Sequence, residues 1–352
     1  GRMNSTRRRD RIRSAIAVLA AALLLVPVAH GATLAVANKA EATVSLIDLD
    51  SGDVVATLPT GDGPHEIGIS PDGRFALVTN YGTREGGGNS LTLIDIPAAS
   101  VVKTIDLGDY RRPHGVEWLD DDSAAITVEA NKALIVVDIA REKVTQSIDT
   151  DQEISHMVAL DPKRGRAYTA NIGSGSVSVL DLGKGVREMN IATGDGAEGI
   201  AVSASGEHIW VTNRGADTIT ILDADTLEEA GEIASEGFPI RATATPGGQV
   251  LVTRARAGDL AIYDSATFEE QRVVAFDLGS MDVEERLFGD RFGDSSVPIG
   301  VIVDAAGEHA WVAHANADVI TEIDLGTADI VRMLRAGKEP DGMGFSGLSV
   351  KR

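Results

Sequence analysis

Short runs of apolar residues recur along the chain from about residue 33 onward. Each run is five or six residues long, is rich in Val, Ile and Thr, and ends at an Asp-Gly, Ser-Gly, Gly-Gly or Asn turn. Runs of this length and composition are typical of β-strands. The connections between them are too short for crossover helices, so the strands must pair as antiparallel hairpins. The pattern predicts an all-β fold.

The strands form a repeat. A strand that ends in aspartate occurs seven times, and its last residues are Asp48, Asp95, Asp138, Asp181, Asp223, Asp264 and Asp324. The first five intervals between them are 41 to 47 residues long, and the sixth is 60. A four-stranded propeller blade takes about 40–50 residues. We therefore predict a seven-bladed β-propeller with four-stranded antiparallel blades. The aspartates themselves are expected to bond turn amides.

We letter the strands of a blade A to D outward from the axis. Strand B also has a recurrent end, which is listed by blade as Asn38, Asn80, Glu129 (where the strand reads one residue shorter), Asn171, Asn213, Arg254 and His314. The first strand after the N-terminal segment, over residues 33–37, is a strand B. Its strand A is predicted to be Pro340–Ser346 (PDGMGFS), which resembles the other inner segments. Pairing of these two segments would close the ring and remove an open sheet edge.

Three stretches resemble the YVTN β-propeller repeat: ISPDGR at residues 69–74, VTNYG at 78–82 and VTNRGADTITILDADT at 211–226. The resemblance extends over residues 33–346, and three of the seven repeats match closely. It implies a bacterial exported seven-bladed propeller within the lactonase-like propeller superfamily. Fold analogy implies no single function, because such propellers serve both as binding scaffolds and as enzymes.

The N-terminal segment has the pattern of an export signal. Five arginines lie between residues 7 and 13, and an apolar run follows over residues 15–28, which is too short for a comfortable membrane span. Ala29 and Gly31 are the small residues that a signal peptidase reads. We predict a signal peptide over residues 1–31 and a propeller over residues 32–352, periplasmic or secreted and without a membrane span. The alternative is an uncleaved N-terminal anchor.

Charge and composition exclude several function classes. The formal net charge is −21, so the surface disfavours nucleic acid. The chain has no cysteine, which excludes disulfides, a lipoprotein anchor, c-type haem and thiolate metal sites. No GxSxG, HExxH, P-loop or dinucleotide-binding motif occurs. We expect a monomer that binds an unknown small ligand or an envelope protein, and no cofactor beyond a possible divalent metal.

The candidate site lies on one face of the disc. Strand order brings the start of strand A, the end of strand B and the longest loops, residues 82–89 and 276–297, to this face, and loops on a rigid scaffold carry function. The first residue of each strand A is predicted to point at the channel mouth: His65, His114, His156, Glu198, Ile240, Ile299 and Asp341. The predicted ligand-binding set is His65, His114, His156, Glu198, Asn80, Asn171, Asn213, Arg241, Arg254 and His314.

Several interpretations of these residues stay open. Polar residues at the mouth can simply bond the next blade's loop. His65, His114, His156 and Glu198 could bind zinc, copper or iron. A lactonase-like or isomerase-like enzyme would use His156, Glu198, Arg241 and Arg254, and the arginines would also suit a small anion. Asp290 and Asp294 lack the ligand spacing of an EF-hand and are expected to be solvated. We favour a non-enzymatic binding scaffold.

Overall fold

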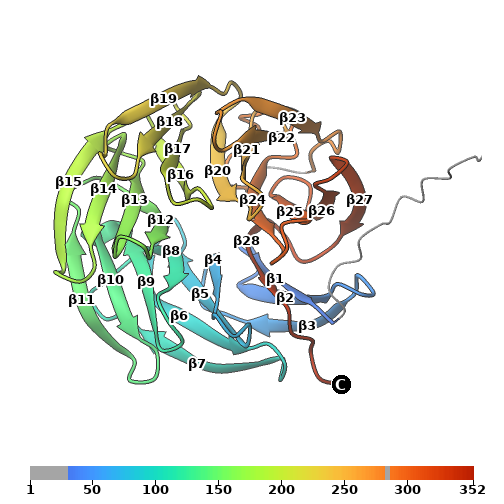
Figure 1. The fold of residues 1–352 in the computed structure, drawn as a ribbon. Coiled ribbons are helices and arrows are strands. Elements are labelled where there is room, and N and C mark those ends of the chain that lie inside the picture. The colour runs from blue at the N-terminus through green and yellow to red at the C-terminus, as the bar shows by residue number, and fades with distance from the viewer. Residues whose placement is uncertain (1–30, 282–285) are drawn as a thin grey trace, which may run out of the picture.

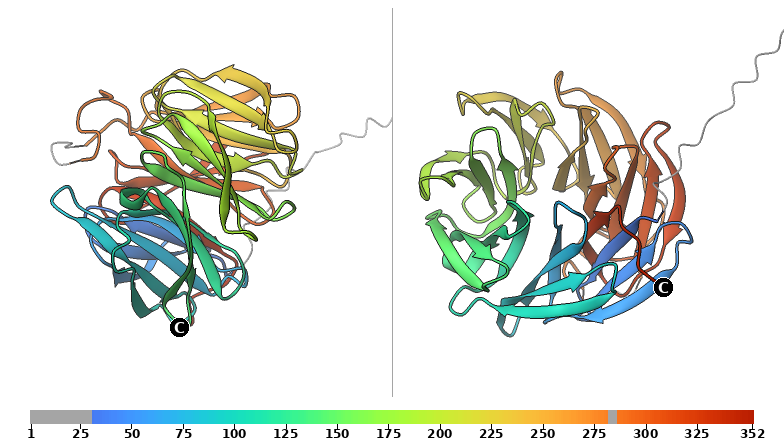
Figure 2. Two further views of the ribbon diagram at one scale, coloured as in Figure 1. Left: turned by 90° about the vertical axis from the view of Figure 1, so that its left-hand side faces the viewer. Right: turned by 60° about the horizontal axis from the view of Figure 1, so that its bottom comes forward.

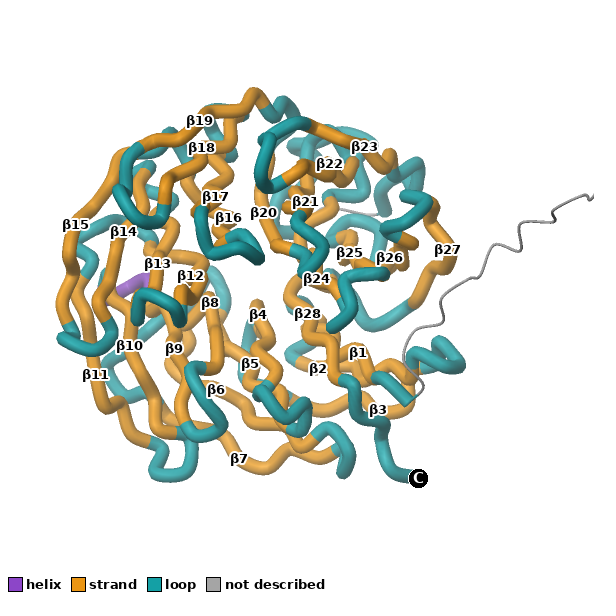
Figure 3. The backbone as a smooth tube through the Cα atoms, in the orientation of Figure 1, coloured by secondary structure: helices purple, strands orange, loops and turns teal. Residues whose placement is uncertain are grey.

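The computed structural model describes residues 31–281 and 286–352. Seven separate four-stranded antiparallel sheets stand around a central axis, as predicted (Figure 1). The predicted signal peptide, residues 1–31, lies outside the described residues except for Gly31. In the described ranges the one helical element is the short 3₁₀ helix η1 (Glu129–Asn131), and no helix is long and apolar enough to cross a membrane (Figure 3).

The blades are numbered in chain order, and each is given from strand A to strand D. Blade 1 contains β28 (Pro340–Ser346), β1 (Thr33–Asn38), β2 (Thr43–Asp48) and β3 (Val54–Pro59). Blade 2 contains β4 (Pro64–Ile69), β5 (Phe75–Gly82), β6 (Gly87–Asp95) and β7 (Ser100–Asp106). Blade 3 contains β8 (Pro113–Trp118), β9 (Ser123–Val128), β10 (Ala133–Asp138) and β11 (Lys143–Asp149).

The remaining four blades follow the same order. Blade 4 contains β12 (Ser155–Asp161), β13 (Arg166–Asn171), β14 (Ser176–Asp181) and β15 (Val186–Ala192). Blade 5 contains β16 (Ala197–Val202), β17 (His208–Asn213), β18 (Thr218–Asp223) and β19 (Glu229–Ala234). Blade 6 contains β20 (Pro239–Ala244), β21 (Gln249–Arg254), β22 (Asp259–Asp264) and β23 (Glu270–Ala275). Blade 7 contains β24 (Pro298–Val303), β25 (His309–His314), β26 (Val319–Asp324) and β27 (Asp329–Leu334).

The core lies between neighbouring sheets. Strands B and C are buried on both faces, whereas the outer strands D are largely exposed, as in β3 and β15. Trp311 of blade 7, for example, packs with Leu34 and Met343 of blade 1. A sheet that is covered on both faces needs apolar residues at consecutive positions, which explains the continuous Val and Ile runs.

The ends of the chain close the ring as predicted. β28 pairs antiparallel with β1, with Thr33 opposite Ser346 and Leu34 opposite Phe345. The red C-terminal strand therefore lies beside the blue N-terminal strands (Figures 1 and 2). The Thr33 hydroxyl also donates to the carbonyl of Leu348 at 2.6 Å. Blade 1 thus has no open inner edge.

The repeated aspartates cap turns on the opposite face, as expected. Asp223 Oδ1 accepts bonds from the backbone N–H groups of Asp225 and Thr226, both at 2.8 Å. Asp264 repeats this arrangement one blade later. These carboxylates order the turns between strands C and D.

Candidate ligand site at the channel mouth

Equivalent residues of the seven inner strands meet at one cavity of about 210 Å³. They are the second residue of each strand A rather than the first, because a proline, serine or alanine residue precedes each of them within its strand. All seven predicted residues line the cavity: His65, His114, His156, Glu198, Ile240, Ile299 and Asp341. The repeat therefore brings together side chains that lie up to 276 residues apart in the chain.

A second ring of residues comes from the position after the residue that pairs with the first residue of strand A. Tyr81, Glu129, Ile172 and Arg214 line the same cavity from this position, and in blade 2 the strand itself continues to Gly82. This ring was not predicted, because Glu129 was matched with Asn80. That match was wrong: Pro113 pairs with Val128 as Pro64 pairs with Asn80, so Glu129 follows the strand and is equivalent to Tyr81. The sequence pattern could have predicted this ring, since it recurs at a fixed position directly after the end of the buried run in strand B.

Hydrogen bonds link the charged groups of blades 2 to 6. The Tyr81 hydroxyl and His156 Nδ1 each donate a short bond to Glu129. His156 Nε2 lies 3.2 Å from Glu198 Oε1. Glu198 in turn accepts bonds from Arg241 and from Arg214, the latter at 2.6 Å. Tyr81, Glu129, His156 and Glu198 therefore already have partners within the protein.

The network sets the charge of its members. Burial disfavours a charged imidazole, but Glu129 and Glu198 outweigh it and raise the pKa of His156 above its ordinary value. Burial also opposes ionisation of Glu198, yet Arg214, Arg241 and His156 hold its pKa well below the usual range. Each ring nitrogen of His156 faces a carboxylate oxygen, an arrangement that favours the imidazolium form with both nitrogens donating. That form has no lone pair for a metal.

Arg241 crosses the channel. It comes from blade 6, and its guanidinium bonds Glu198 of blade 5 and Glu66 of blade 2, the latter at 3.0 Å. Arg241 also lines a second cavity, of about 310 Å³, together with Glu66 and Glu117. This side chain therefore separates the cavity at the mouth from the rest of the channel.

His65 and His114 differ from His156 because they are neutral. Burial and nearby Lys39 lower the pKa of His65 to about 3. Its Nδ1 lies 2.7 Å from the carbonyl oxygen of Gly63, which can only accept, so Nδ1 carries the proton and Nε2 a lone pair. Burial also lowers the pKa of His114, whose side chain is 1% exposed and whose two ring nitrogens have no partner.

The mouth has an apolar sector at blades 6 and 7. Here the inner-strand residues are Ile240 and Ile299, and Phe288 and Phe292, from the segment 286–297, cover them. The covering segment is fixed by Arg286, which donates to Asp318 at 2.6 and 2.8 Å. Asp290 and Asp294 of the same segment are exposed, as expected for solvated carboxylates.

Five residues of the predicted ligand-binding set lie outside the cavity. They tie strand B to strand C: the amides of Asn80, Asn171 and Asn213 donate to hydroxyls of strand C, Arg254 forms two bonds to Asp259, and His314 Nε2 bonds Thr321. Their side chains complete the blade instead of entering the channel. The structure does not bring these five residues to the cavity, because the end of strand B and the residue after it point in different directions.

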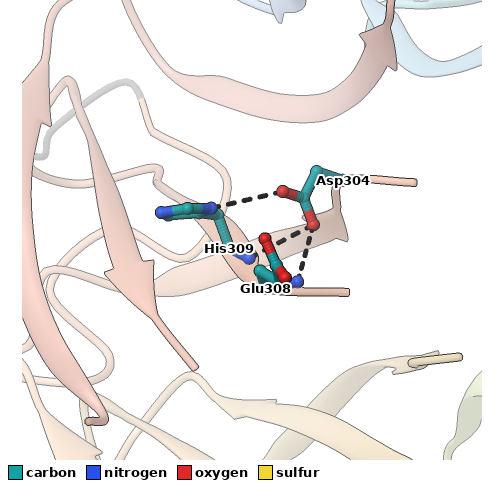
Figure 4. Close-up of side chains that lie close together, drawn as sticks. All are labelled: Asp304, Glu308 and His309. Carbon is teal, nitrogen blue, oxygen red and sulfur yellow. Dashed lines mark hydrogen bonds and ion pairs between the residues drawn. The ribbon is translucent and has the colours of Figure 1, made fainter. Parts of the chain in front are cut away.

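A cluster of metal-ligand type lies far from the mouth. In the described ranges one group of three such residues, Asp304, Glu308 and His309, has its donor atoms within 4.8 Å of one another (Figure 4). Asp304 Oδ1 accepts bonds from the backbone N–H groups of Glu308 and His309. Ser203 caps the equivalent turn of blade 5 in the same way, through the N–H of His208. The group is therefore explained as a turn cap.

Comparison with known proteins supports the propeller assignment. A YNCE-like β-propeller family model matches residues 6–125. The chain is similar to protein NirF of Pseudomonas aeruginosa, with 27% identity over 209 residues, which cover 52% of each chain. It is also similar to the uncharacterized protein YwhL of Bacillus subtilis, with 29% identity over 149 residues, covering 42% of this chain and 30% of YwhL. The matches span about half or less of these relatives.

Two solved structures share the fold. A chain of hydrazine synthase from Kuenenia stuttgartiensis superposes with a TM-score of 0.65 at 20% identity, covering 85% of this chain and 94% of that one. A functionally unknown protein from Desulfotomaculum acetoxidans gives a TM-score of 0.71 at 13% identity, covering 89% and 98%. At these identities the likeness concerns the fold alone. The chain is a seven-bladed β-propeller, and its residues 6–125 match the YNCE-like β-propeller model.

Proposed function

We propose that this propeller is a binding scaffold that holds a small ligand in the cavity at the channel mouth. The observation that carries the proposal is His114: its imidazole is 1% exposed, lines the cavity and has no partner for either nitrogen. Buried polar groups are almost always hydrogen-bonded, so an unpaired pair of ring nitrogens favours an external partner. Enclosure by apolar walls with a few convergent polar groups is typical of ligand sites.

The ligand is expected to be neutral or only weakly anionic. Arg214 and Arg241 both bond Glu198, so an anion would have to displace a carboxylate from them. The groups that remain for recognition are the neutral imidazoles of His65 and His114. Ile240 and Ile299 supply an apolar wall. We therefore favour a small molecule with an apolar body and one or two hydrogen-bonding atoms.

Thermal-shift titration with indole, benzimidazole and benzoate tests this proposal. A neutral heteroaromatic that binds should raise the unfolding free energy by about 2.7 kcal/mol at a hundredfold excess over its Kd, and benzoate should raise it less. His114→Ala should abolish the shift. His208→Ala is the matched control, because His208 starts β17 on the opposite face. An equal shift in the His114 variant would overturn the proposal.

An enzymatic role is the second hypothesis. His156, Glu198 and Arg241 line one cavity, but Arg254, the fourth predicted member, is paired with Asp259 and does not line it. The bonds between these groups leave none of them free as a general base. A lactone-hydrolysis screen with His156→Ala as control separates the two functions: turnover that is lost in the variant would favour the enzyme.

We also propose export to the periplasm or the medium, from the basic and apolar pattern of residues 1–31. The processed protein should begin at Ala32. Intact mass spectrometry of the envelope fraction measures this directly. A product that keeps the arginines of residues 7–13 would contradict cleavage.

A further inference from the structure

Three adjacent blades each direct a donor atom without a hydrogen bond at the channel mouth. Asp341 of β28, His65 of β4 and His114 of β8 occupy the same strand position in blades 1, 2 and 3. Asp341 Oδ1 and both nitrogens of His114 are buried without a hydrogen bond. His65 Nε2 carries a lone pair, because Nδ1 donates to Gly63. Asp341 and His114 are 2% and 1% exposed, so these atoms are shielded from bulk solvent.

The next two blades lack this feature. His156 and Glu198 hold the same strand position in blades 4 and 5, but they bond each other and also Glu129 and Arg241. The unpaired donors are therefore confined to three neighbours, and they are two neutral imidazoles and one carboxylate. This donor set suits zinc, iron(II), cobalt(II) or copper(II), whereas magnesium and calcium prefer oxygen ligands.

The backbone brings the three residues close. A Cβ on Gly342 would lie 2.2 Å from the His65 carbonyl oxygen, so β28 approaches β4 this closely only because residue 342 is glycine. The ring centroids of His65 and His114 are 5.1 Å apart. The three donor atoms are not among the described groups within 4.8 Å of one another, so an ion must draw them together by rotation about side-chain bonds.

Neighbouring groups orient two of the three donors. The Gly63 carbonyl holds the His65 ring in the tautomer that leaves Nε2 free, which is the usual arrangement for a metal-ligating histidine. Lys39 Nζ lies 3.2 Å from Asp341 Oδ2, whereas Oδ1 has only the more distant Arg241 Nη2, at 4.0 Å. The first contact fixes the His65 ring, and the second orients the Asp341 carboxylate.

We propose that Asp341, His65 and His114 bind one transition-metal ion, with its open coordination positions facing the cavity. The inference rests on the proposed ligand site and names part of what binds there. It differs from the sequence-based set of His65, His114, His156 and Glu198, because both nitrogens of His156 face carboxylates and Glu198 already accepts from Arg214 and Arg241.

Metal titration of the chelator-treated full chain tests the proposal. Binding of Co²⁺ is followed by visible absorption, and binding of Zn²⁺ is followed by calorimetry. One equivalent should bind. His65→Gln, His114→Gln and Asp341→Asn should each weaken binding at least 100-fold while circular dichroism stays unchanged. His309→Ala, in the turn-cap cluster, is the matched control and should bind as the parent does.

Two results would overturn the proposal: no binding of either metal, or binding that is lost in the His309 variant and kept in the other three. The neutral heteroaromatic titration, repeated with the chelator-treated chain, separates this inference from the proposed function. If the thermal shift with the heteroaromatic still depends on His114 while neither metal binds, the metal site is wrong and the proposed ligand site stands. If neither the metals nor the heteroaromatic bind, both proposals are wrong.

Discussion

The polar sector of the channel mouth, in blades 1 to 5, and the apolar sector, in blades 6 and 7, fill the same strand position with different kinds of buried side chain. Blades 1 to 5 place charged or imidazole side chains at the second position of strand A, whereas blades 6 and 7 place Ile240 and Ile299 there. In the polar sector the burial of charge is offset by hydrogen bonds between blades. In the apolar sector no charge is buried at this position, and Phe288 and Phe292 of the segment 286–297 cover the isoleucines. The backbone position is the same in both sectors, so the side chain alone determines whether the position is polar or apolar.

The position after strand B follows the same division. In blades 1 and 5, where the inner residue is a carboxylate, this position supplies an opposite charge, as Lys39 does for Asp341 and Arg214 does for Glu198. Where the inner residue is isoleucine, it is Ala255 or Ala315, small enough for Phe292 to pack above. The second residue of strand A and the residue after strand B therefore determine both the charge compensation and the packing at the mouth. Only His65 and His114 of the polar sector stay neutral with lone pairs to offer.

Removal of residues 340–352 should have the largest effect on both sectors, because it opens the ring that holds them together. The deletion takes away β28, its pairing with β1 and the buried Met343. Domain stabilities are about 5–15 kcal/mol, and loss of a whole inner strand should remove most of this or cause aggregation. Thermal unfolding and light scattering measure it. Deletion of the exposed residues 351–352 alone is the control. A Tm within two degrees of the parent would contradict closure.

Glu198→Ala should break the polar sector. It leaves Arg241 and His156 buried with a lost partner, and breaking a buried ion pair in this way costs about 3–5 kcal/mol. Chemical denaturation gives the change in unfolding free energy. Ile299→Val, at the equivalent position of the apolar sector, is the comparison and should cost about 0.5–1.5 kcal/mol. If both substitutions lower the unfolding free energy equally, the hydrogen-bond network contributes no more to stability than apolar packing does.

Phe292→Ala should loosen the apolar sector without touching the polar one. The ring is 7% exposed and packs with Phe238 and Phe288, so truncation should cost about 3 kcal/mol at most, because the covering segment can relax locally. Hydrogen exchange should rise in residues 286–297 and stay unchanged in β12 and β16. Faster exchange in those two strands would show that the sectors are coupled.

Acid should weaken the polar sector selectively. Since the folded-state pKa of Glu198 lies below its unfolded value of 4.5, its contribution is present above about pH 4.5 and is lost as the pH falls below it. Urea unfolding between pH 7 and pH 3 should therefore bring the parent and Glu198→Gln closer together at the acid end. A constant difference across this range would mean that Glu198 has an ordinary pKa.

Leu287→Ala should have the smallest effect on stability. Leu287 is 45% exposed and lines the cavity at the mouth, so the unfolding free energy should change by less than about 0.5 kcal/mol. Binding of the heteroaromatic probes should still change, because the residue borders their site. Unchanged binding would place the entrance elsewhere.

The fold and half of the site followed from the repeat in the sequence. Seven spaced strand ends predicted seven blades, and Pro340–Ser346 was identified as the closing strand from its likeness to other strands A. The seven residues of the first ring followed from this periodicity, since equivalent positions of a repeat point in equivalent directions. Glu129 was misplaced by one residue because η1 interrupts the pattern that marks the end of strand B elsewhere.

Partner choice within the mouth did not follow from the sequence. The repeat does not predict that Arg241 of blade 6 bonds Glu66 of blade 2 across the channel. It also does not predict that His156 contacts two carboxylates while His114 has no hydrogen-bond partner. Such contacts join residues of different blades, and they depend on distances across the closed ring. Periodicity along the chain specifies which positions face inward. The side chains that meet there, and hence the charge of each histidine, are set by the closure of the ring.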